Sequence, residues 1–249
     1  MDILPIMVVM MVMALGPQAP AWGADYQDPA TGMEFVLVKG GCYKMWGSAG
    51  PKRSGPEVCV ADFYLGKYEV TQGQWQALMG GNPSAFKDCG QNCPVESVDW
   101  DDAQAFTERL NKRTGRIYRL PLEAEWEYAA RSLGKDELWA GTSAEEVLKD
   151  YAWYGANAGK RPHPVGEKKP NSLGLYDMSG NVWEWMEDKY LEHSKAGALS
   201  EREFNWEYCV LRGGSWDDTP AELRFVPKNL SRVIETELSR GFRLALPTR

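Results

Sequence analysis

The sequence predicts an α+β domain that is rich in loops, with few helices and short strands. Composition is the first reason: the 249 residues include 25 Gly and 11 Trp. Such an excess favours irregular backbone held by aromatic packing over a helical bundle. The second reason is the pattern along the chain, where three short segments carry helix start and stop signals and short strand-like runs lie near both ends.

Length and charge restrict the domain count and the partners. Without an N-terminal apolar segment, roughly 225 residues remain, which suits one large domain or two small ones, and one domain is the simplest account. No internal repeat or low-complexity tract divides the chain. The net charge is −7 and the pI is about 5.1, which argues against a nucleic-acid backbone as a partner.

Residues 1–24 are predicted to be a signal peptide. The apolar run at 3–15 is too short to span a bilayer comfortably, and the small residues after it suit cleavage near 21–24. Asp2 stands before the run without a Lys or Arg, so an uncleaved anchor is the alternative. Cleavage would leave a periplasmic or secreted protein with no stable membrane span.

Export makes the five cysteines informative. Cys89 and Cys93 close a tight local loop. Cys42 and Cys59 bracket a polar segment between two strand-like runs. We therefore predict two disulfides, Cys42–Cys59 and Cys89–Cys93, with free thiols as the alternative if export fails.

The fifth cysteine and the two histidines are not predicted to be reactive: we expect His163 to pack in a loop and His193, which lies in a polar stretch, to be solvated. Cys209 has no His or base near it in sequence, which favours a buried free thiol over a nucleophile. A zinc site is the competing interpretation of the cysteines, but neither His163 nor His193 lies near a Cys pair.

The regular elements follow a lead at 25–32 that we expect to be disordered or loosely packed, and together they form a domain over 33–248. Strands are expected at 33–39, 58–64, 65–70, 210–216 and 240–246, and helices at 72–79, 100–113 and 123–132. Thr71 and Asp99 supply N-caps, whereas Leu122 cannot, so the third helix should start more weakly by about 1 kcal/mol. The last strand is expected to pair near the first, with loops at 135–170 and 187–208.

The stretch 171–185 is the most informative part of the chain. It is too rich in Gly, Asn and Ser for a helix and too aromatic for a solvated loop. We expect a loop bent at its Gly and Asn residues that holds Asp177 and Glu184 at fixed positions with free carbonyls between them. Hard cations such as calcium prefer carboxylate and backbone oxygens of this kind. The alternative is that both side chains only bind turn amides and a nearby Arg.

Five motifs occur in a fixed order along the chain: G-K-Y-E-V-T-Q-G-Q-W at 66–75, R-L-P-L-E-A-E-W-E-Y-A-A-R at 119–131, G-L-Y-D-M-S-G-N-V-W-E-W at 174–185, L-R-G-G-S-W at 211–216 and G-F-R at 241–243. Together they resemble the motifs of the formylglycine-generating enzyme (sulfatase-modifying factor) family. The resemblance covers roughly residues 33–246. It implies the family fold, which is related to C-type lectins.

The resemblance also shows which positions of this sequence correspond to the family's active-site residues. The enzyme that names the family oxidises a substrate cysteine with two active-site cysteines that hold copper, and the matching positions here are Asp218 and Leu223. Neither side chain can act as a soft ligand for Cu(I). Ser215 matches the family's active-site serine, and Ser215, Asp217 and Asp218 would line the equivalent groove. We therefore expect no copper-dependent cysteine oxidation.

The residues at the positions of the family's calcium site are compatible with calcium binding. The resemblance implies that calcium is held by the side chains of Asp177 and Glu184 and by the carbonyls of Gly180 and Val182, with Asp in place of an amide ligand. These ligands agree with the hard-cation site that the residues of the loop predict by themselves. A second family site, near 151–157, matches poorly and is not expected here.

The first functional hypothesis is an exported, calcium-stabilised module that binds a protein or peptide through the surface at 215–223 or serves as an accessory subunit. The alternative is a metal-dependent oxidoreductase with a non-standard active site. Iron in such enzymes takes two His and one carboxylate, and neither His163 nor His193 has a partner His at ligand spacing. Exposed acids such as Asp217 are usually only solvated.

Overall fold

The computed structural model describes residues 25–45, 55–193, 205–225, 229–232, 234 and 236–248. The predicted signal peptide, and with it the anchor alternative, lies outside these ranges. None of the helices within them has the length and apolar character needed to cross a membrane.

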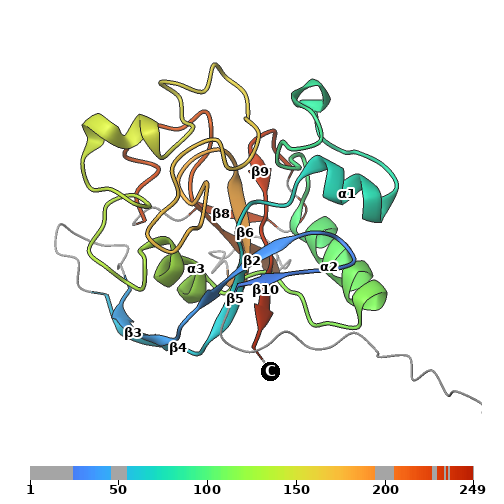
Figure 1. The fold of residues 1–249 in the computed structure, drawn as a ribbon, viewed down its shortest axis with the longest axis horizontal. Helices are drawn as coiled ribbons and strands as arrows, with labels where there is room; N and C mark the ends of the chain where they lie inside the picture. Colours follow the sequence, from blue (N-terminus) through green and yellow to red (C-terminus); the bar gives the residue numbers. More distant parts are fainter. Residues whose placement is uncertain are drawn as a thin grey trace, which may run out of the picture.

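The first sheet joins the two ends of the described chain. Its antiparallel order is β1-β2-β5-β10, and its strands are Tyr26–Gln27, Glu34–Val38, Phe63–Gly66 and Ala245–Pro247. Figure 1 shows β10 beside β5 at the centre of the molecule. The prediction that the last strand returns to pair near the first is therefore confirmed.

Both faces of this sheet are buried, because successive side chains of a strand point to opposite sides. Phe35 and Tyr64 pack in one cluster with Trp75 and Phe106 of the helices α1 (Gln72–Met79) and α2 (Trp100–Thr114). Val36 packs in a second cluster against α3 (Glu123–Ala130). The result is a sheet between helices with an aromatic core, as the composition indicated.

The lead at 25–32 is not loosely packed, and that prediction is wrong. Tyr26 and Asp28 are buried, and Tyr26 pairs with Phe35 in β1 and β2. The Asp28 carboxylate accepts hydrogen bonds from the hydroxyls of Tyr26 at 2.9 Å and Tyr118 at 2.6 Å. The hydroxyl of Tyr118, which is 90 residues away from Asp28 in sequence, ties the segment to the core, and the local sequence cannot predict this contact.

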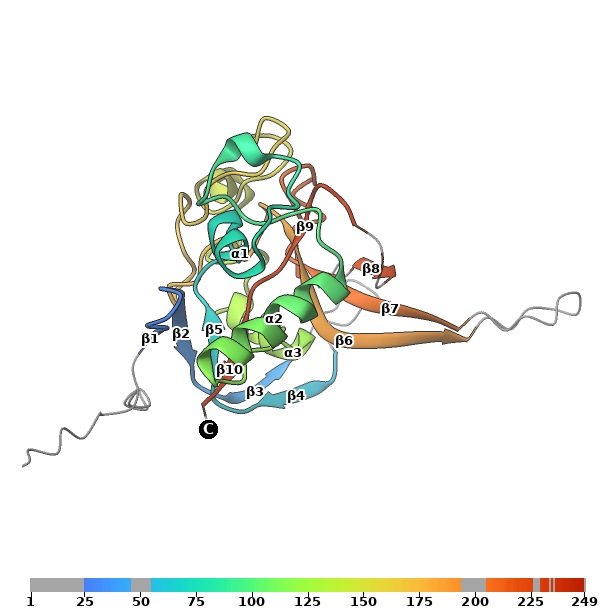
Figure 2. The ribbon, with the colours of Figure 1, turned by 90° about the vertical axis from the view of Figure 1, so that its right-hand side faces the viewer.

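The second sheet has the order β8-β7-β6-β9. Its strands are Asn229–Arg232, Asn205–Arg212, Trp183–His193 and Arg240–Gly241. Figure 2 shows β6 and β7 projecting together from the rest of the molecule. The loop predicted at 187–208 is thus wrong for its two flanks. The antiparallel ladder between β6 and β7 pairs the backbone groups of these polar segments.

The helix signals are largely confirmed. Thr71 and Gln74 exchange backbone and side-chain hydrogen bonds at the start of α1, and Asp99 and Asp102 do the same for α2. Gly80 and Gly115 end these helices in the left-handed conformation. A short 3-10 helix, Glu145–Asp150, lies within the loop predicted at 135–170, and another, Lys87–Cys89, ends at the first cysteine of the Cys89–Cys93 loop.

Helix α3 begins after Leu122, which has no capping oxygen. Glu125 accepts the Leu122 N–H at 3.0 Å, and Asp188 of β6 accepts the Glu123 N–H at 2.6 Å. The missing cap is therefore supplied by a residue far away in sequence, and this offsets the weak start expected from Leu122 alone.

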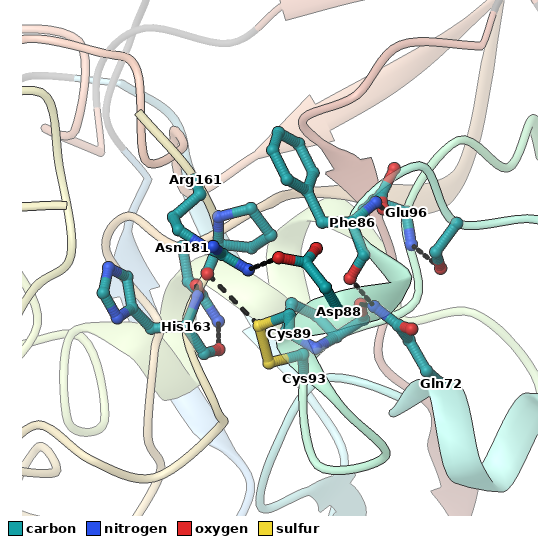
Figure 3. The surroundings of a disulfide bond; sticks show 12 residues. Gln72, Phe86, Asp88, Cys89, Cys93, Glu96, Arg161, His163 and Asn181 are labelled. Atoms are coloured by element: carbon teal, nitrogen blue, oxygen red, sulfur yellow. Dashed lines mark hydrogen bonds and ion pairs between the residues drawn. A yellow bond between two sulfur atoms is a disulfide. The ribbon is translucent and has the colours of Figure 1, made fainter. Parts of the chain in front are cut away.

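Both predicted disulfides are present, Cys42–Cys59 between β3 (Gly41–Lys44) and β4 (Glu57–Val60), and Cys89–Cys93 in a surface loop. Figure 3 shows the second bond, where the Cys89 sulfur lies 3.3 Å from the Pro162 carbonyl oxygen. Cys209 is buried and takes part in neither disulfide, as predicted.

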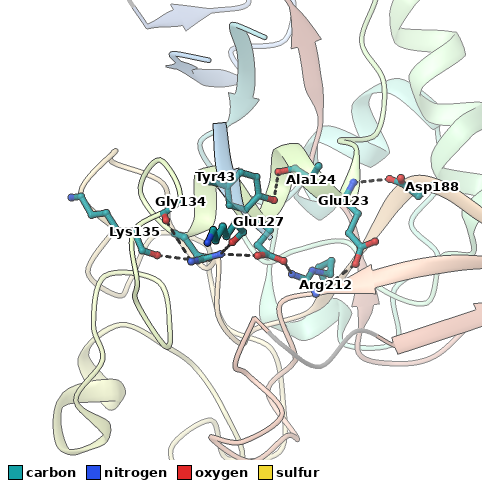
Figure 4. Close-up of polar contacts among 10 residues, drawn as sticks. Tyr43, Glu123, Ala124, Glu127, Gly134, Lys135, Asp188 and Arg212 are labelled. Carbon is teal, nitrogen blue, oxygen red and sulfur yellow. Dashed lines mark hydrogen bonds and ion pairs between the residues drawn. The ribbon is translucent and has the colours of Figure 1, made fainter. Parts of the chain in front are cut away.

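A buried ion network ties α3 to β7. Glu127 accepts hydrogen bonds from Arg131 at 2.9 Å and from Arg212 at 2.6 Å, and all three side chains are at most 4% exposed. Figure 4 shows Glu123 and Asp188 at the Arg212 end of the same row. One carboxylate between two guanidinium groups therefore fixes the helix on the sheet.

Candidate functional site

The stretch 171–185 is a bent loop that enters β6, as predicted. Asp177, Gly180 and Asn181 have φ values of 56°, 83° and 62°, all in the left-handed region. At Gly180 a Cβ would meet the Trp153 carbonyl oxygen at 2.1 Å, so glycine is required there. The Asn171 side chain donates to the carbonyls of Ala129 and Ala130 and anchors the loop on the end of α3.

Asp177 has one oxygen in use and one without a partner. Its side chain is 2% exposed, and Oδ2 accepts the Gly166 N–H at 2.8 Å. Among the described residues nothing hydrogen-bonds to the buried Oδ1. Burial raises the pKa of Asp177 to about 6.

Glu184 forms a buried ion pair with Arg243. Arg243 Nε lies 2.7 Å from Glu184 Oε2 and its Nη2 lies 2.7 Å from Oε1, with both side chains 0% exposed. Trp126 Nε1 also donates to Oε2, at 2.7 Å. The contact with an Arg, the alternative to calcium, is therefore present for Glu184. Because each carboxylate oxygen can accept two bonds, Oε1 retains acceptor capacity.

Glu69, which the sequence analysis missed, is the third carboxylate at this site. It is 1% exposed. Burial, together with the negative charges of Asp177 and Glu184, raises the pKa of Glu69 well above its ordinary value. Its signal in the sequence is an acidic residue in a strand-like run, within the motif at 66–75.

The residues at this loop fit a hard cation. Asp177 Oδ1 is buried without a hydrogen-bond partner, and the pKa values of Glu69 and Asp177 are raised by burial and by neighbouring carboxyl groups, so a cation would stabilise the ionised forms of both groups. A cation here would take oxygens from Asp177 and Glu184 and the carbonyls of Gly180 and Val182. Within the described ranges, no three His, Cys, Asp or Glu side chains form a metal-holding group, so side chains alone would not supply the ligands.

The surface at 215–223 places Ser215 and Asp218 together. Asp218 Oδ2 accepts the Ser215 N–H at 2.7 Å and the Ser215 hydroxyl at 2.6 Å, and burial raises the pKa of Asp218. Asp217 and Glu222 are exposed, and Glu222 binds Thr219. The acidic residues of this segment therefore do not converge on one point.

Leu223 is 0% exposed and lies in an apolar cluster with Trp139, Leu148 and Tyr154. The second of the family's two cysteine positions is thus filled by core packing. With Asp218 bound to Ser215, neither position offers a thiolate.

His163 packs in a loop, as expected. Its ring stacks on Trp153 with centroids 3.7 Å apart, and its Nε2 lies 2.8 Å from the Ala158 carbonyl oxygen. Its backbone N–H donates to the Asn181 side chain. The side chain of His193 lies outside the described residues.

Comparison with known proteins identifies the family. Residues 23–247 match the family described as "Sulfatase-modifying factor enzyme 1-like domain". The chain belongs to this family. A protein of Paenibacillus barcinonensis named "Chaperone protein LppX" is 35% identical over 233 residues, which cover 74% of this chain and 78% of that protein. The bovine "Inactive C-alpha-formylglycine-generating enzyme 2" is 34% identical over 135 residues, 51% of this chain and 39% of that protein.

The fold is that of the family as well. The solved structure of "Treponema denticola variable protein 1" superposes with a TM-score of 0.77 at 28% identity, covering 90% of this chain and 98% of that one. The α+β, loop-rich formylglycine-generating-enzyme fold expected from the five motifs is therefore confirmed.

Proposed function

We propose that this domain is an exported, non-catalytic member of the family that serves as a calcium-stabilised binding or accessory module for a protein or peptide. One observation carries the proposal: the two copper-ligand positions are Asp218, which is bound to Ser215, and Leu223, which is buried in the core. The name of one relative, a chaperone, and that of another, an inactive enzyme, support an accessory role.

The first test concerns cysteine oxidation. A peptide with the sequence Cys-X-Pro-X-Arg is incubated with the domain, copper and oxygen, and aldehyde is measured by mass spectrometry. We expect no aldehyde, because no soft ligand for copper is available at positions 218 and 223. The double variant Asp218→Cys/Leu223→Cys is the matched control for copper binding. Formation of aldehyde by the unaltered domain would refute the non-catalytic role.

The second test concerns calcium. Elemental analysis should find calcium in the purified domain, and EDTA should lower its Tm. At a calcium concentration 100 times the Kd, binding contributes about 2.7 kcal/mol, or roughly 5–10 °C for a domain of this size. Asp177→Ala should abolish the difference between calcium and EDTA, whereas the exposed Asp217→Ala should leave it intact.

Elemental analysis also decides between the proposal and the oxidoreductase alternative. Iron or copper held tightly after purification would favour the alternative. The stacking of His163 on Trp153 and its contact with the Ala158 carbonyl are the reasons we prefer the binding module.

Export is supported by the two disulfides, which form and persist in oxidising compartments. We expect the protein in the periplasm or the medium, with its mature N-terminus near 21–24. Fractionation of cells, followed by intact-mass measurement, checks both points. A full-length protein in the membrane fraction would indicate the anchor instead.

A further inference from the structure

Glu69 lies between β5 and α1, and the residue that follows it, Val70, is held by two backbone hydrogen bonds. The Val70 N–H donates to the Phe242 carbonyl at 2.9 Å, and the Val70 carbonyl accepts from the Val95 N–H at 2.9 Å. The carboxylate of Glu69 is therefore aimed at the loop 177–184 from a fixed piece of backbone.

Both oxygens of Glu69 bind this loop. Oε1 accepts the Val182 N–H at 3.1 Å, and Oε2 accepts from the Asn181 side chain at 2.6 Å. The backbone of Asn181 lies in the left-handed region, with a φ of 62°. Its side chain also accepts a hydrogen bond from the His163 N–H and donates one to the His163 carbonyl. Glu69 therefore fixes the peptide that joins Asn181 to Val182.

This peptide lies between the two carbonyls implied as calcium ligands. The Asn181 N–H donates to the Trp153 carbonyl and the Trp183 N–H to the Ser239 carbonyl. A trans peptide points its C=O opposite to its N–H. The Gly180 carbonyl is thus directed away from Trp153, and the Val182 carbonyl away from Ser239. Movement of the middle peptide would turn both carbonyls.

The buried ionisable side chains around these carbonyls also suit a cation. Arg243 is bound to both oxygens of Glu184, and no described ion pair includes Glu69 or Asp177. Asp177 Oδ1 is buried and has no hydrogen-bond partner. Three buried carboxyl groups therefore stand near one guanidinium group, and a divalent cation would favour their ionised forms.

We infer that Glu69 is a positioning residue of the calcium site: it orients the Gly180 and Val182 carbonyls through the Asn181–Val182 peptide and adds negative charge beside the ligands. This inference rests on the proposed calcium site. Partners of this kind, one step removed from a metal, typically change its affinity 10- to 100-fold when they are substituted.

The test is calcium titration calorimetry on four forms of the full domain: unaltered, Glu69→Gln, Asp177→Ala and the control Glu96→Gln. Glu96 is also fully buried, and it accepts hydrogen bonds from the Phe86 N–H and the Ser97 hydroxyl. We expect Glu69→Gln to bind calcium 10- to 100-fold more weakly and to lose most of the Tm difference between calcium and EDTA. Glu96→Gln should lower the Tm equally in both and keep its affinity.

The outcomes separate the two ideas. If Glu69→Gln keeps its affinity while Asp177→Ala loses it, the role of Glu69 is overturned and the calcium site stands. If the unaltered domain binds no calcium, both are overturned. Circular dichroism establishes that each variant is folded. If Glu69→Gln does not fold, Glu69→Asp is used in its place, because this variant keeps the charge but is too short to reach Val182. A loss of calcium affinity of less than 10-fold in Glu69→Asp would then overturn the role of Glu69.

Discussion

The buried network on α3 gives the sharpest stability prediction. Substituting Glu127→Gln removes the negative charge between Arg131 and Arg212 and leaves at most one good acceptor where two short hydrogen bonds exist. Arg131 and Arg212 would lose the carboxylate that they share, although Arg212 keeps its contact with Glu123 at 3.7 Å. Breaking a buried pair by removing one partner costs about 3–5 kcal/mol. For a domain of this size that corresponds to a fall in Tm of roughly 6–20 °C.

The assay is urea unfolding followed by tryptophan fluorescence, with the disulfides intact. The matched control is Glu108→Gln on α2, which removes an exposed partner of Lys112 at 3.9 Å, with side chains 72% and 81% exposed. That change should stay within about 0.5 kcal/mol. If the free energy of unfolding of Glu127→Gln fell no further than that of Glu108→Gln, the network would contribute nothing and the reasoning would fail.

Two further predictions concern single contacts. Asp188→Ala should lower the free energy of unfolding by about 1 kcal/mol, because the Glu123 N–H at the start of α3 loses its cap; an unchanged denaturation curve would show that Glu125 caps the helix alone. Burial alone would raise the pKa of Asp28, but hydrogen bonds from Tyr118, Tyr26 and Thr31 outweigh it and lower the pKa below its ordinary value. The contribution of Asp28 to the free energy of unfolding is therefore present above the pKa of the unfolded chain and is lost as the pH falls through the pKa of the folded state. The stability difference between the unaltered domain and Asp28→Asn should therefore shrink towards low pH, and a difference that grew on acidification would contradict this assignment.

Local signals predicted the helices well. Thr71 and Asp99 cap α1 and α2, and Gly80 and Gly115 end them, because the groups that satisfy a helix end lie within a few residues of it. The disulfides were predictable for a related reason. Cys89 and Cys93 are close in sequence, and Cys42 and Cys59 lie directly opposite each other on paired strands.

Predictions failed where a segment depends on distant partners. The lead at 25–32 looks polar and loose, yet Tyr118 binds Asp28 from far along the chain. The polar residues after Met186 look like a loop, yet β6 continues to His193 because β7 pairs with it. The polarity of a segment indicates the solvent exposure of its side chains, whereas strand formation also depends on a partner strand, which here is β7.

At the candidate site, too, features set by neighbouring residues were predictable and contacts between distant residues were not. The sequence by itself determined a bent loop at 171–185, because Gly180 and Asn181 favour left-handed backbone, and it determined that no thiol stands at 218 and 223. Only the tertiary structure brought Glu69 and Arg243 to that loop. A backbone bend is decided by neighbouring residues, whereas the balance of buried charge is decided by which distant side chains the folded core brings into contact.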